Sequence, residues 1–292
     1  MKNVPKYITF ALKDRTAIVT GGSGGIGSSV VKDFLREGAN VVAADVNAGR
    51  LENYCRKLRG EFRGRILGVP ADISNPASVR RLIDKTISRF KTIDILVNTA
   101  AVQKPIGNLI DVSVKDWIKC VNTNIVGTML CCKAVLPVMK AKKHGSIINF
   151  SGGGATFPRV NFSAYGSTKA AIVRFTETIS EEFKKYGIRV NAVSPGSVYT
   201  NMMKEIIKAG KRSGYSDYHM ALNARSKGGD SPALSSDLCV FLASDASIGI
   251  TGKLFSAVWD DFRSKPFRSL AMHSRNIYTL RRIDGNKFFE RN

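Results

Sequence analysis

Apolar residues along this chain fall into two kinds of segment, which alternate. Short runs rich in β-branched residues are typical of buried strands, and longer runs with a period near 3.6 are typical of helices that pack on a core. The strand-like runs are 16–20, 40–46, 93–98, 146–151 and 189–193, and the helix-like runs are 28–36, 114–139, 164–186 and 235–242. This alternation predicts an α/β fold, in which a doubly wound parallel sheet carries helices on both faces. With 292 residues and no recognisable linker or repeat, the chain is expected to form a single domain.

A glycine-rich turn separates the first predicted strand from the first predicted helix. It reads Gly21-Gly22-Ser23-Gly24-Gly25-Ile26-Gly27. Strand, glycine turn and helix in this order are the context of a dinucleotide-binding loop, since glycines let the backbone approach a pyrophosphate. The helix N-terminus then presents free N–H groups and the positive end of its dipole. A plain glycine turn is the alternative, which the flanking elements disfavour.

An acid follows the second predicted strand. Asp45 stands about twenty residues beyond the glycine turn, where a carboxylate can accept hydrogen bonds from the adenosine ribose hydroxyls. The same charge would repel a 2′-phosphate. The glycine turn contains no basic residue, and Val46 rather than an arginine follows the acid. We therefore expect NAD(H) in preference to NADP(H); a solvated carboxylate at a strand end is the alternative.

Tyr165 and Lys169 are spaced for proton transfer. Four residues make one helical turn, so both side chains project from the same face of the helix predicted over 164–186. A neighbouring ammonium favours the phenolate, so Lys169 is expected to lower the pKa of Tyr165 toward neutrality. A Tyr-x-x-x-Lys pair by itself is weak, because surface helices supply such pairs freely.

Taken together, these motifs resemble the short-chain dehydrogenase/reductase family of single-domain Rossmann-fold oxidoreductases. The resemblance runs from about residue 12 to about residue 260, and it adds Ala71-Asp72-Ile73, Asn98-Thr99-Ala100-Ala101, Asn124 and the segment Ser194 to Thr200 to the motifs above. Thr99 and Ala101 depart from the family's Asn-Asn-Ala-Gly. The positions for cofactor binding are Thr20, Gly21, Ser23, Gly25, Ile26, Gly27, Asp45, Asp72, Ile73, Asn98, Tyr165, Lys169, Pro195, Gly196, Val198 and Thr200.

The resemblance also implies a mechanism. Tyr165 acts as general acid and base, Lys169 tunes it and holds the nicotinamide ribose, and Asn124 holds a water in a proton relay. An amide satisfied inside its own helix is the alternative for Asn124, and a helix N-cap is an additional role for Thr200. The expected enzyme is an NAD(H)-dependent oxidoreductase that interconverts a secondary alcohol and a ketone. A nucleotide-linked sugar and a 3-oxoacyl carrier are the candidate substrates.

One departure affects the catalytic set. The family's serine lies thirteen residues before the tyrosine, where this chain has Gly152, and a serine occurs one residue earlier, at Ser151. On a strand, an offset of one residue points a side chain to the opposite face. The glycines at 152–154 could form a bulge that re-aims Ser151, so Ser151 is kept as a catalytic candidate. Without a serine, an NAD-binding sensor or scaffold with little catalysis is the alternative function.

The chain is strongly basic, with 45 Lys and Arg against 23 acids and a net charge of +22. Such a field attracts anions, whether nucleic acid, an anionic small-molecule substrate such as a nucleotide-linked one, or an acidic carrier protein; a solvated basic surface without such a partner is the alternative. No nucleic-acid-binding motif accompanies the charge, so no nucleic-acid partner is expected. The segment 201–230 is expected to be a mobile substrate lid; it has six basic residues. The family resemblance implies a homodimer or homotetramer.

Domain limits and location complete the expectations. Residues 1–262 are predicted to form the catalytic domain, and residues 263–292 a basic C-terminal extension. The five cysteines form no Cys-x-x-Cys and no metal-ligand set with the three histidines, so no metal and reduced, cytoplasmic thiols are expected. No uninterrupted apolar run approaches the length of a membrane span, and residues 1–10 lack the apolar core of a signal peptide.

Overall fold

A computed structural model describes residues 11–281 of the chain. Its centre is a seven-stranded sheet in which every pairing is parallel, in the order β3-β2-β1-β4-β5-β6-β7. The strands are β1 (Thr16–Thr20), β2 (Asn40–Asp45), β3 (Ile66–Pro70), β4 (Ile95–Asn98), β5 (Gly145–Phe150), β6 (Ile188–Ser194) and β7 (Leu254–Ser256). The predicted α/β fold is confirmed.

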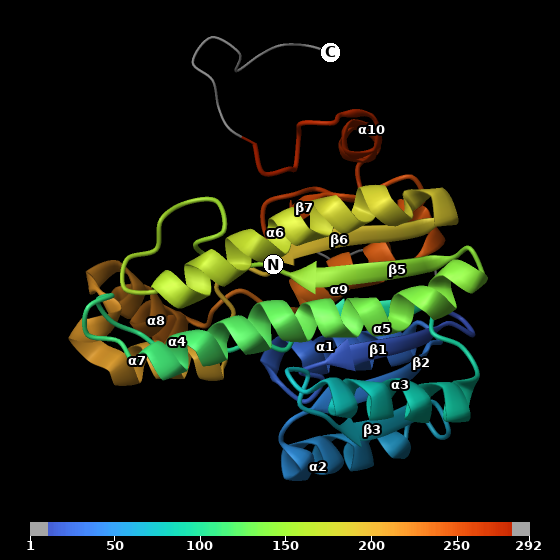
Figure 1. Cartoon of the computed structure of the whole chain (residues 1–292), viewed down its shortest axis with the longest axis horizontal. Helices are drawn as coiled ribbons and strands as arrows, with labels where there is room; N and C mark the ends of the chain where they lie inside the picture. Colours follow the sequence, from blue (N-terminus) through green and yellow to red (C-terminus); the bar gives the residue numbers. More distant parts are fainter. Residues whose placement is uncertain (1–10, 282–292) are drawn as a thin grey trace.

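Helices cover both faces of this sheet (Figure 1). They are α1 (Gly25–Arg36), α2 (Ala48–Arg59), α3 (Pro76–Phe90), α4 (Val114–Val121), α5 (Gly127–Ala141), α6 (Ser163–Phe183), α7 (Asn201–Ala209), α8 (Tyr215–Lys227), α9 (Pro232–Ala243) and α10 (Lys265–His273). Short turns of 3₁₀-helix lie at 184–186, 210–213 and 245–247. The predicted helix over 114–139 is interrupted by a π-helical turn, η1 (Asn122–Val126), which joins α4 to α5.

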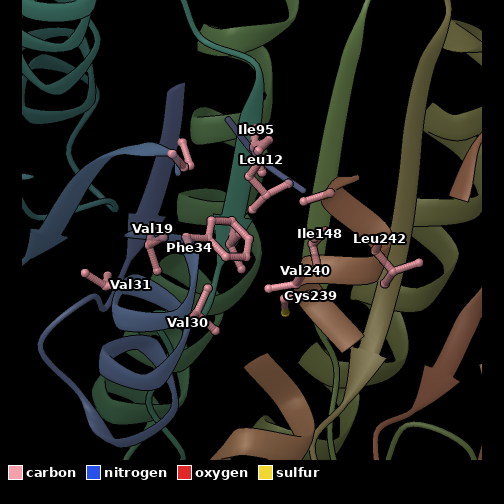
Figure 2. Close-up of a cluster of buried hydrophobic side chains, with 14 of the residues drawn as sticks. Leu12, Val19, Val30, Val31, Phe34, Ile95, Ile148, Cys239, Val240 and Leu242 are labelled. Carbon is pink, nitrogen blue, oxygen red and sulfur yellow. The ribbon is translucent and has the colours of Figure 1, made fainter. Parts of the chain in front are cut away.

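Two apolar layers pack against the two faces. One joins α1, α2 and α9 to the sheet, and Figure 2 shows its centre, where Phe34 and Val30 of α1 face Val240 of α9. The other joins α3, α5 and α6 to the opposite face, with Leu82 and Val135 fully buried. Because both faces are covered, the central strands are apolar on both sides, which explains their continuous hydrophobic runs.

The order in which the strands are added to the sheet reverses at β1. The chain builds outward through β2 and β3, then crosses back to β4 on the other side of β1. In a parallel sheet all the carboxyl ends lie at one edge, and a crevice for a ligand opens where the strand order reverses. Thr20, Asp45 and Asn98 end three neighbouring strands at this edge.

The segment expected as a lid is helical in the structure. Helices α7 and α8 lie beyond the carboxyl ends of the strands, beside the start of α6 (Figure 1). Met203 and Ile206 of α7 and Ala221 of α8 form a small apolar cluster with Phe162 and Tyr165. The lid region therefore sits directly over the expected catalytic tyrosine.

The described part of the C-terminal extension is packed on the domain. Phe267 and Ala271 of α10 belong to the main core, and Tyr278 stacks on Phe255 of β7. The Leu254 N–H donates to the Tyr278 carbonyl at 2.7 Å. Within residues 11–281, the predicted extension after residue 262 is thus packed on the catalytic domain. The remainder of the predicted extension, 282–292, lies outside the described residues.

The helical run 114–141 is apolar and long enough to cross a membrane by length and composition. Cys131, Val135 and Met139 of this run are buried against the sheet. Packing in the core of the domain accounts for the apolar residues on this buried face.

Candidate active site

Tyr165 and Lys169 lie one turn apart near the start of α6, as their spacing predicted. Both are buried, with 8% and 4% of their surfaces exposed. The Lys169 ammonium nitrogen lies 5.4 Å from the centre of the Tyr165 ring and donates a hydrogen bond of 2.8 Å to the Phe150 carbonyl at the end of β5. This bond ties the helix that bears the pair to the carboxyl edge of the sheet.

Burial decides the acidity of this pair in a way that the sequence did not show. It raises the pKa of Tyr165, because a phenolate is poorly solvated there, whereas the Arg159 cation acts in the opposite direction and lowers the pKa of Tyr165. Burial also lowers the pKa of Lys169, to about 8. The expectation that Lys169 brings the tyrosine pKa toward neutrality is therefore wrong for the protein alone. Tyr165 is kept protonated at neutral pH, as a proton donor must be.

Gly152 occupies the place of the family's serine and borders the tyrosine directly. A Cβ atom added at Gly152 would lie 2.7 Å from the Tyr165 hydroxyl oxygen. Ser151 does not fill that place, because its side chain is 2% exposed and donates a 3.3 Å hydrogen bond to the Lys169 carbonyl. The glycines at 152–154 do not re-aim Ser151 toward the tyrosine; Ser151 secures the main chain of α6 to the end of β5.

Asn124 lies in the π-helical turn between α4 and α5 and is almost fully buried. Its side-chain oxygen accepts from the Val102 N–H at 2.9 Å, and its side-chain nitrogen donates to the Val102 carbonyl at 2.8 Å and to Thr168 at 2.9 Å. The side chain is therefore used to fix the backbone after β4 against α6. Single π-helical turns are frequent at functional sites, and the proton-relay role of Asn124 stays a prediction.

The glycine turn has the shape that a pyrophosphate needs. Gly21 has a positive φ of 65°, and Gly24 precedes α1 without a side-chain cap. The first turn of α1 contains no acid, so its free N–H groups and dipole have no negative partner within the helix. A Cβ atom at Gly25 would lie 2.5 Å from the Thr200 methyl carbon. A side chain at this position would therefore collide with Thr200, which explains the glycine.

Asp45 has a partner that sequence reasoning missed. Arg50, in the first turn of α2, donates to both carboxylate oxygens of Asp45 at 3.0 Å, and to the Ser23 hydroxyl at 3.0 Å. Ser23 donates from its hydroxyl to Asp45 at 2.7 Å. The place expected for the ribose thus has a carboxylate and a guanidinium side by side. No basic residue occurs inside the glycine turn or directly after Asp45; Arg50 lies farther along the chain, and α2 brings it back to both Ser23 and Asp45.

Four other predicted cofactor residues lie in β1, in β4 and in the loop after β3. Asp72 is exposed and accepts from the Ser74 N–H and hydroxyl, while Ile73 is buried against Gly127. The Asn98 side chain instead points into the sheet, where it donates to Asn149 at 2.9 Å. Asn98 therefore belongs to a polar network between β4 and β5 rather than presenting its amide to a ligand. Thr20 is fully buried and receives a 2.5 Å hydrogen bond from Thr99.

The Pro195–Thr200 segment follows β6 at the same edge. Gly196 has a φ of 80°, and a Cβ atom there would lie 2.5 Å from the Asp230 carboxylate, which accepts from the Ser197 N–H at 2.6 Å. Val198 is buried. Thr200 stands at the N-cap of α7 without a side-chain capping bond. Its methyl group contacts the glycine turn, so the structure brings the two expected ends of the cofactor site together.

Arg159, between β5 and α6, is a second residue that the sequence did not single out. Its guanidinium carbon lies 3.8 Å from the centre of the Phe162 ring and 5.3 Å from that of Tyr165. Nε and Nη2 both donate to Asp217 Oδ1 of α8, at 2.8 and 2.6 Å. The ion pair is only 12% and 14% exposed. No sequence pattern indicates it, since the partners lie 58 residues apart.

Within residues 11–281, no group of three or more His, Cys, Asp or Glu side chains is arranged to hold a metal ion. All five cysteines are free and buried. Burial raises the pKa of the Cys131 thiol to about 12, so this thiol is not a nucleophile at neutral pH.

Known proteins share this fold and sequence. A family model for the short chain dehydrogenases matches residues 15–211. Oxidoreductase UcpA of Escherichia coli (strain K12) is 37% identical over 82% of this chain and 92% of its own length. The BbsD subunit of (2S)-[(R)-hydroxy(phenyl)methyl]succinyl-CoA dehydrogenase from Thauera aromatica is 34% identical over 83% and 94%.

Solved structures agree with the sequence relatives. An NAD⁺-bound xylitol dehydrogenase superposes with a TM-score of 0.77 at 25% identity, over 84% of this chain and 97% of that one. Levodione reductase gives a TM-score of 0.76 at 25% identity, over 84% and 96%. These relatives are oxidoreductases, and their family binds nicotinamide cofactors. The chain belongs to the short-chain dehydrogenase family and is an oxidoreductase.

Proposed function

We propose that this protein interconverts a secondary alcohol and a ketone with NAD(H), and that Tyr165 transfers the proton. The observation that carries the proposal is the position of Tyr165. Its hydroxyl lies beside the backbone of Gly152 at the carboxyl edge of the sheet, in the same turn of α6 as Lys169. Within residues 11–281 no group hydrogen-bonds to this hydroxyl, so it is available to a ligand.

The residues at the edge of the sheet fit a dinucleotide. The uncapped start of α1 provides a positively polarised place for the pyrophosphate. Asp45 would hold the adenosine ribose, and Lys169 and the Pro195–Thr200 segment would hold the nicotinamide end. When bound, the nicotinamide ring supplies or accepts the hydride.

Tyr165 transfers the proton in both directions of the reaction. In ketone reduction Tyr165 donates its proton to the carbonyl oxygen, and its raised pKa ensures that the proton is present at neutral pH. In alcohol oxidation the phenolate accepts the proton, and the Arg159 cation offsets part of the cost of the buried negative charge. Gly152 offers no hydroxyl, so Tyr165 is the donor to the carbonyl oxygen.

NAD(H) rather than NADP(H) remains our proposal. Asp45 is 4% exposed at the end of β2, and its carboxylate would repel a 2′-phosphate. Arg50 partly neutralises that charge, so the preference is expected to be moderate. The names of the relatives include a succinyl-CoA derivative, an acyl-carrier protein and xylitol. A sugar and a 3-oxoacyl carrier accordingly stay candidate substrates.

The test is turnover by wild-type protein and Tyr165→Phe, followed by NADH absorbance over a panel of ketones and secondary alcohols. We expect turnover that falls by about three orders of magnitude or more in Tyr165→Phe, consistent with loss of a general acid, while the dissociation constant of NADH is nearly unchanged. Equal turnover by both proteins would exclude this mechanism. NADH binding without turnover on any substrate would favour a sensor or scaffold, the function suggested by Gly152.

A further inference from the structure

The space beside Tyr165 is bordered by a second polar group, the Arg159 guanidinium. A Cβ atom at Gly153 would lie 3.9 Å from Arg159 Nη1, and a Cβ atom at the preceding Gly152 would lie 2.7 Å from the Tyr165 hydroxyl oxygen. Arg159 and Tyr165 therefore border one short stretch of backbone that carries no side chains. The guanidinium carbon also lies 5.3 Å from the centre of the Tyr165 ring, so the two groups border the same region.

Asp217 holds the guanidinium by one side only. It accepts from Nε and Nη2 through the single oxygen Oδ1, so the edge formed by Nη1 and the second N–H of Nη2 faces away from the ion pair. Within residues 11–281, Nη1 has no hydrogen-bond partner. The face of the guanidinium is packed on Phe162 at 3.8 Å, which fixes its plane. The donor edge is therefore held in place and is not used by the protein.

Two parallel N–H groups at a planar edge match the two oxygens of a carboxylate. Asp217 already neutralises part of the arginine charge, which suits an anion with one negative charge better than a phosphate with nearly two. Ile106, Met203 and Ile206 belong to one apolar cluster with Tyr165, so these uncharged side chains suit the apolar part of a substrate.

We propose that Arg159 binds a carboxylate of the substrate, so that the enzyme acts on hydroxy acids and oxo acids whose reacting carbon lies close to the carboxylate. This inference rests on the proposed function, because it takes Tyr165 as the group that meets the reacting carbon. Arg159 is the specificity-determining residue. Asp217 is a positioning residue that acts through Arg159 and joins the lid helix α8 to the site.

The first experiment measures binding without turnover. The full-length protein is loaded with NAD⁺, which cannot reduce an oxo acid, and is titrated calorimetrically with acetoacetate, pyruvate and phenylglyoxylate and with the methyl ester of each. We expect at least one acid to bind more tightly than its ester. Arg159→Gln should weaken the binding of that acid on the order of 10- to 100-fold, the range for a hydrogen-bonded charged group. The binding of its ester should not change.

Three variants separate binding from folding. Arg159→Lys keeps the charge but loses the planar edge, so its affinity should lie between those of the wild type and Arg159→Gln. Asp217→Asn should weaken the binding of the acid less than Arg159→Gln does. Arg225→Gln removes an exposed arginine from the same helix α8 and should bind as the wild type does. If Arg225→Gln weakened the binding of the acid as much as Arg159→Gln does, the proposal would be overturned.

The second experiment measures turnover of the same pairs with NADH. The expected result is a KM for the acid below that for its ester, a difference that Arg159→Gln abolishes mainly through KM. Equal binding of acids and esters, or no binding of any acid, overturns the carboxylate site even if Tyr165-dependent turnover is found. Binding that depends on Arg159 without any turnover contradicts the proposed function and leaves the carboxylate site intact.

Discussion

The backbone of Gly152 lies so close to the Tyr165 hydroxyl that a methyl group at Gly152 would come within 2.7 Å of the hydroxyl oxygen. We predict that Gly152→Ala displaces the tyrosine hydroxyl and lowers kcat on the order of 10-fold or more, since small misplacements of a reacting group are costly. The dissociation constant of NADH should not change. Steady-state kinetics and cofactor titration measure the two effects.

The control for this prediction is another glycine-to-alanine change. Gly60→Ala places its methyl group where nothing lies within 4 Å, so kcat should equal that of the wild type. Unchanged kcat in Gly152→Ala would show that the tyrosine hydroxyl can move without loss of activity. The contact with Tyr165 would then not explain why glycine, and not serine, occupies position 152.

Arg159 is expected to set the pH at which alcohol oxidation becomes fast. The phenolate of Tyr165 is the base, burial raises the pKa of Tyr165, and the Arg159 cation lowers it. Oxidation should therefore rise with pH, and Arg159→Gln should move the rising limb of the kcat profile to higher pH because the phenolate loses a nearby cation. The profile is measured at saturation with the methyl ester of a hydroxy acid, whose binding does not require Arg159.

Arg225→Gln serves as the matched control for the pH profile, because it removes the same charge from an exposed position. A limb that moves to lower pH in Arg159→Gln, or moves equally in both variants, would contradict the assignment of the base to Tyr165 next to Arg159.

The Asp45–Arg50 pair leads to a prediction on cofactor choice. The wild type should bind NADH more tightly than NADPH. Asp45→Ala removes the carboxylate that repels a 2′-phosphate and frees Arg50 from its two 3.0 Å hydrogen bonds, so NADPH should gain affinity relative to NADH. The additional change Arg50→Ala should reverse that gain. Fluorescence titration of the three proteins with both cofactors gives the six dissociation constants; a gain that survives Arg50→Ala would assign NADPH binding to other cations.

Phe267 is expected to hold the C-terminal segment on the domain. It is 7% exposed and lies with its ring centre 5.2 Å from that of Phe255 and 4.8 Å from that of Tyr278. Phe267→Ala should lower the free energy of unfolding by about 3 kcal/mol, as for other buried phenylalanines. Leu270→Ala, on the same helix but 41% exposed, should have a small effect. Denaturant unfolding measures both, and equal effects would argue against a packed segment.

The sequence was sufficient for the elements whose signal is local. The glycine turn, the spacing of Tyr165 and Lys169 and the apolar strands each depend on neighbours in sequence, and the structure shows all of them. Arg50 and Arg159 were missed because their partners are distant in sequence: Ser23 is 27 residues from Arg50, and Asp217 is 58 from Arg159. The acidity of Tyr165 depends on burial by the whole fold, which no motif records.

Side-chain direction was the other limit. Ser151 was one residue out of register with the expected serine, and only the structure shows that its hydroxyl meets the Lys169 carbonyl. Asn98 matches its motif by identity, yet its amide bonds across the sheet to Asn149. A motif gives the residue type at a position, whereas packing decides which group the side chain meets.

The hydrogen bond from Leu254 to Tyr278 protects the edge of the sheet from self-association. β7 is the last strand of the sheet, and Leu254 turns its N–H away from β6 toward Tyr278, while Lys253 donates from its side chain to the carbonyls of Ser274 and Ile277. The segment after α10 thus occupies one donor, the Leu254 N–H, of an edge that would otherwise be open to a strand from another molecule. A chain cut before α10 would therefore be expected to aggregate through that edge even where its active site is intact.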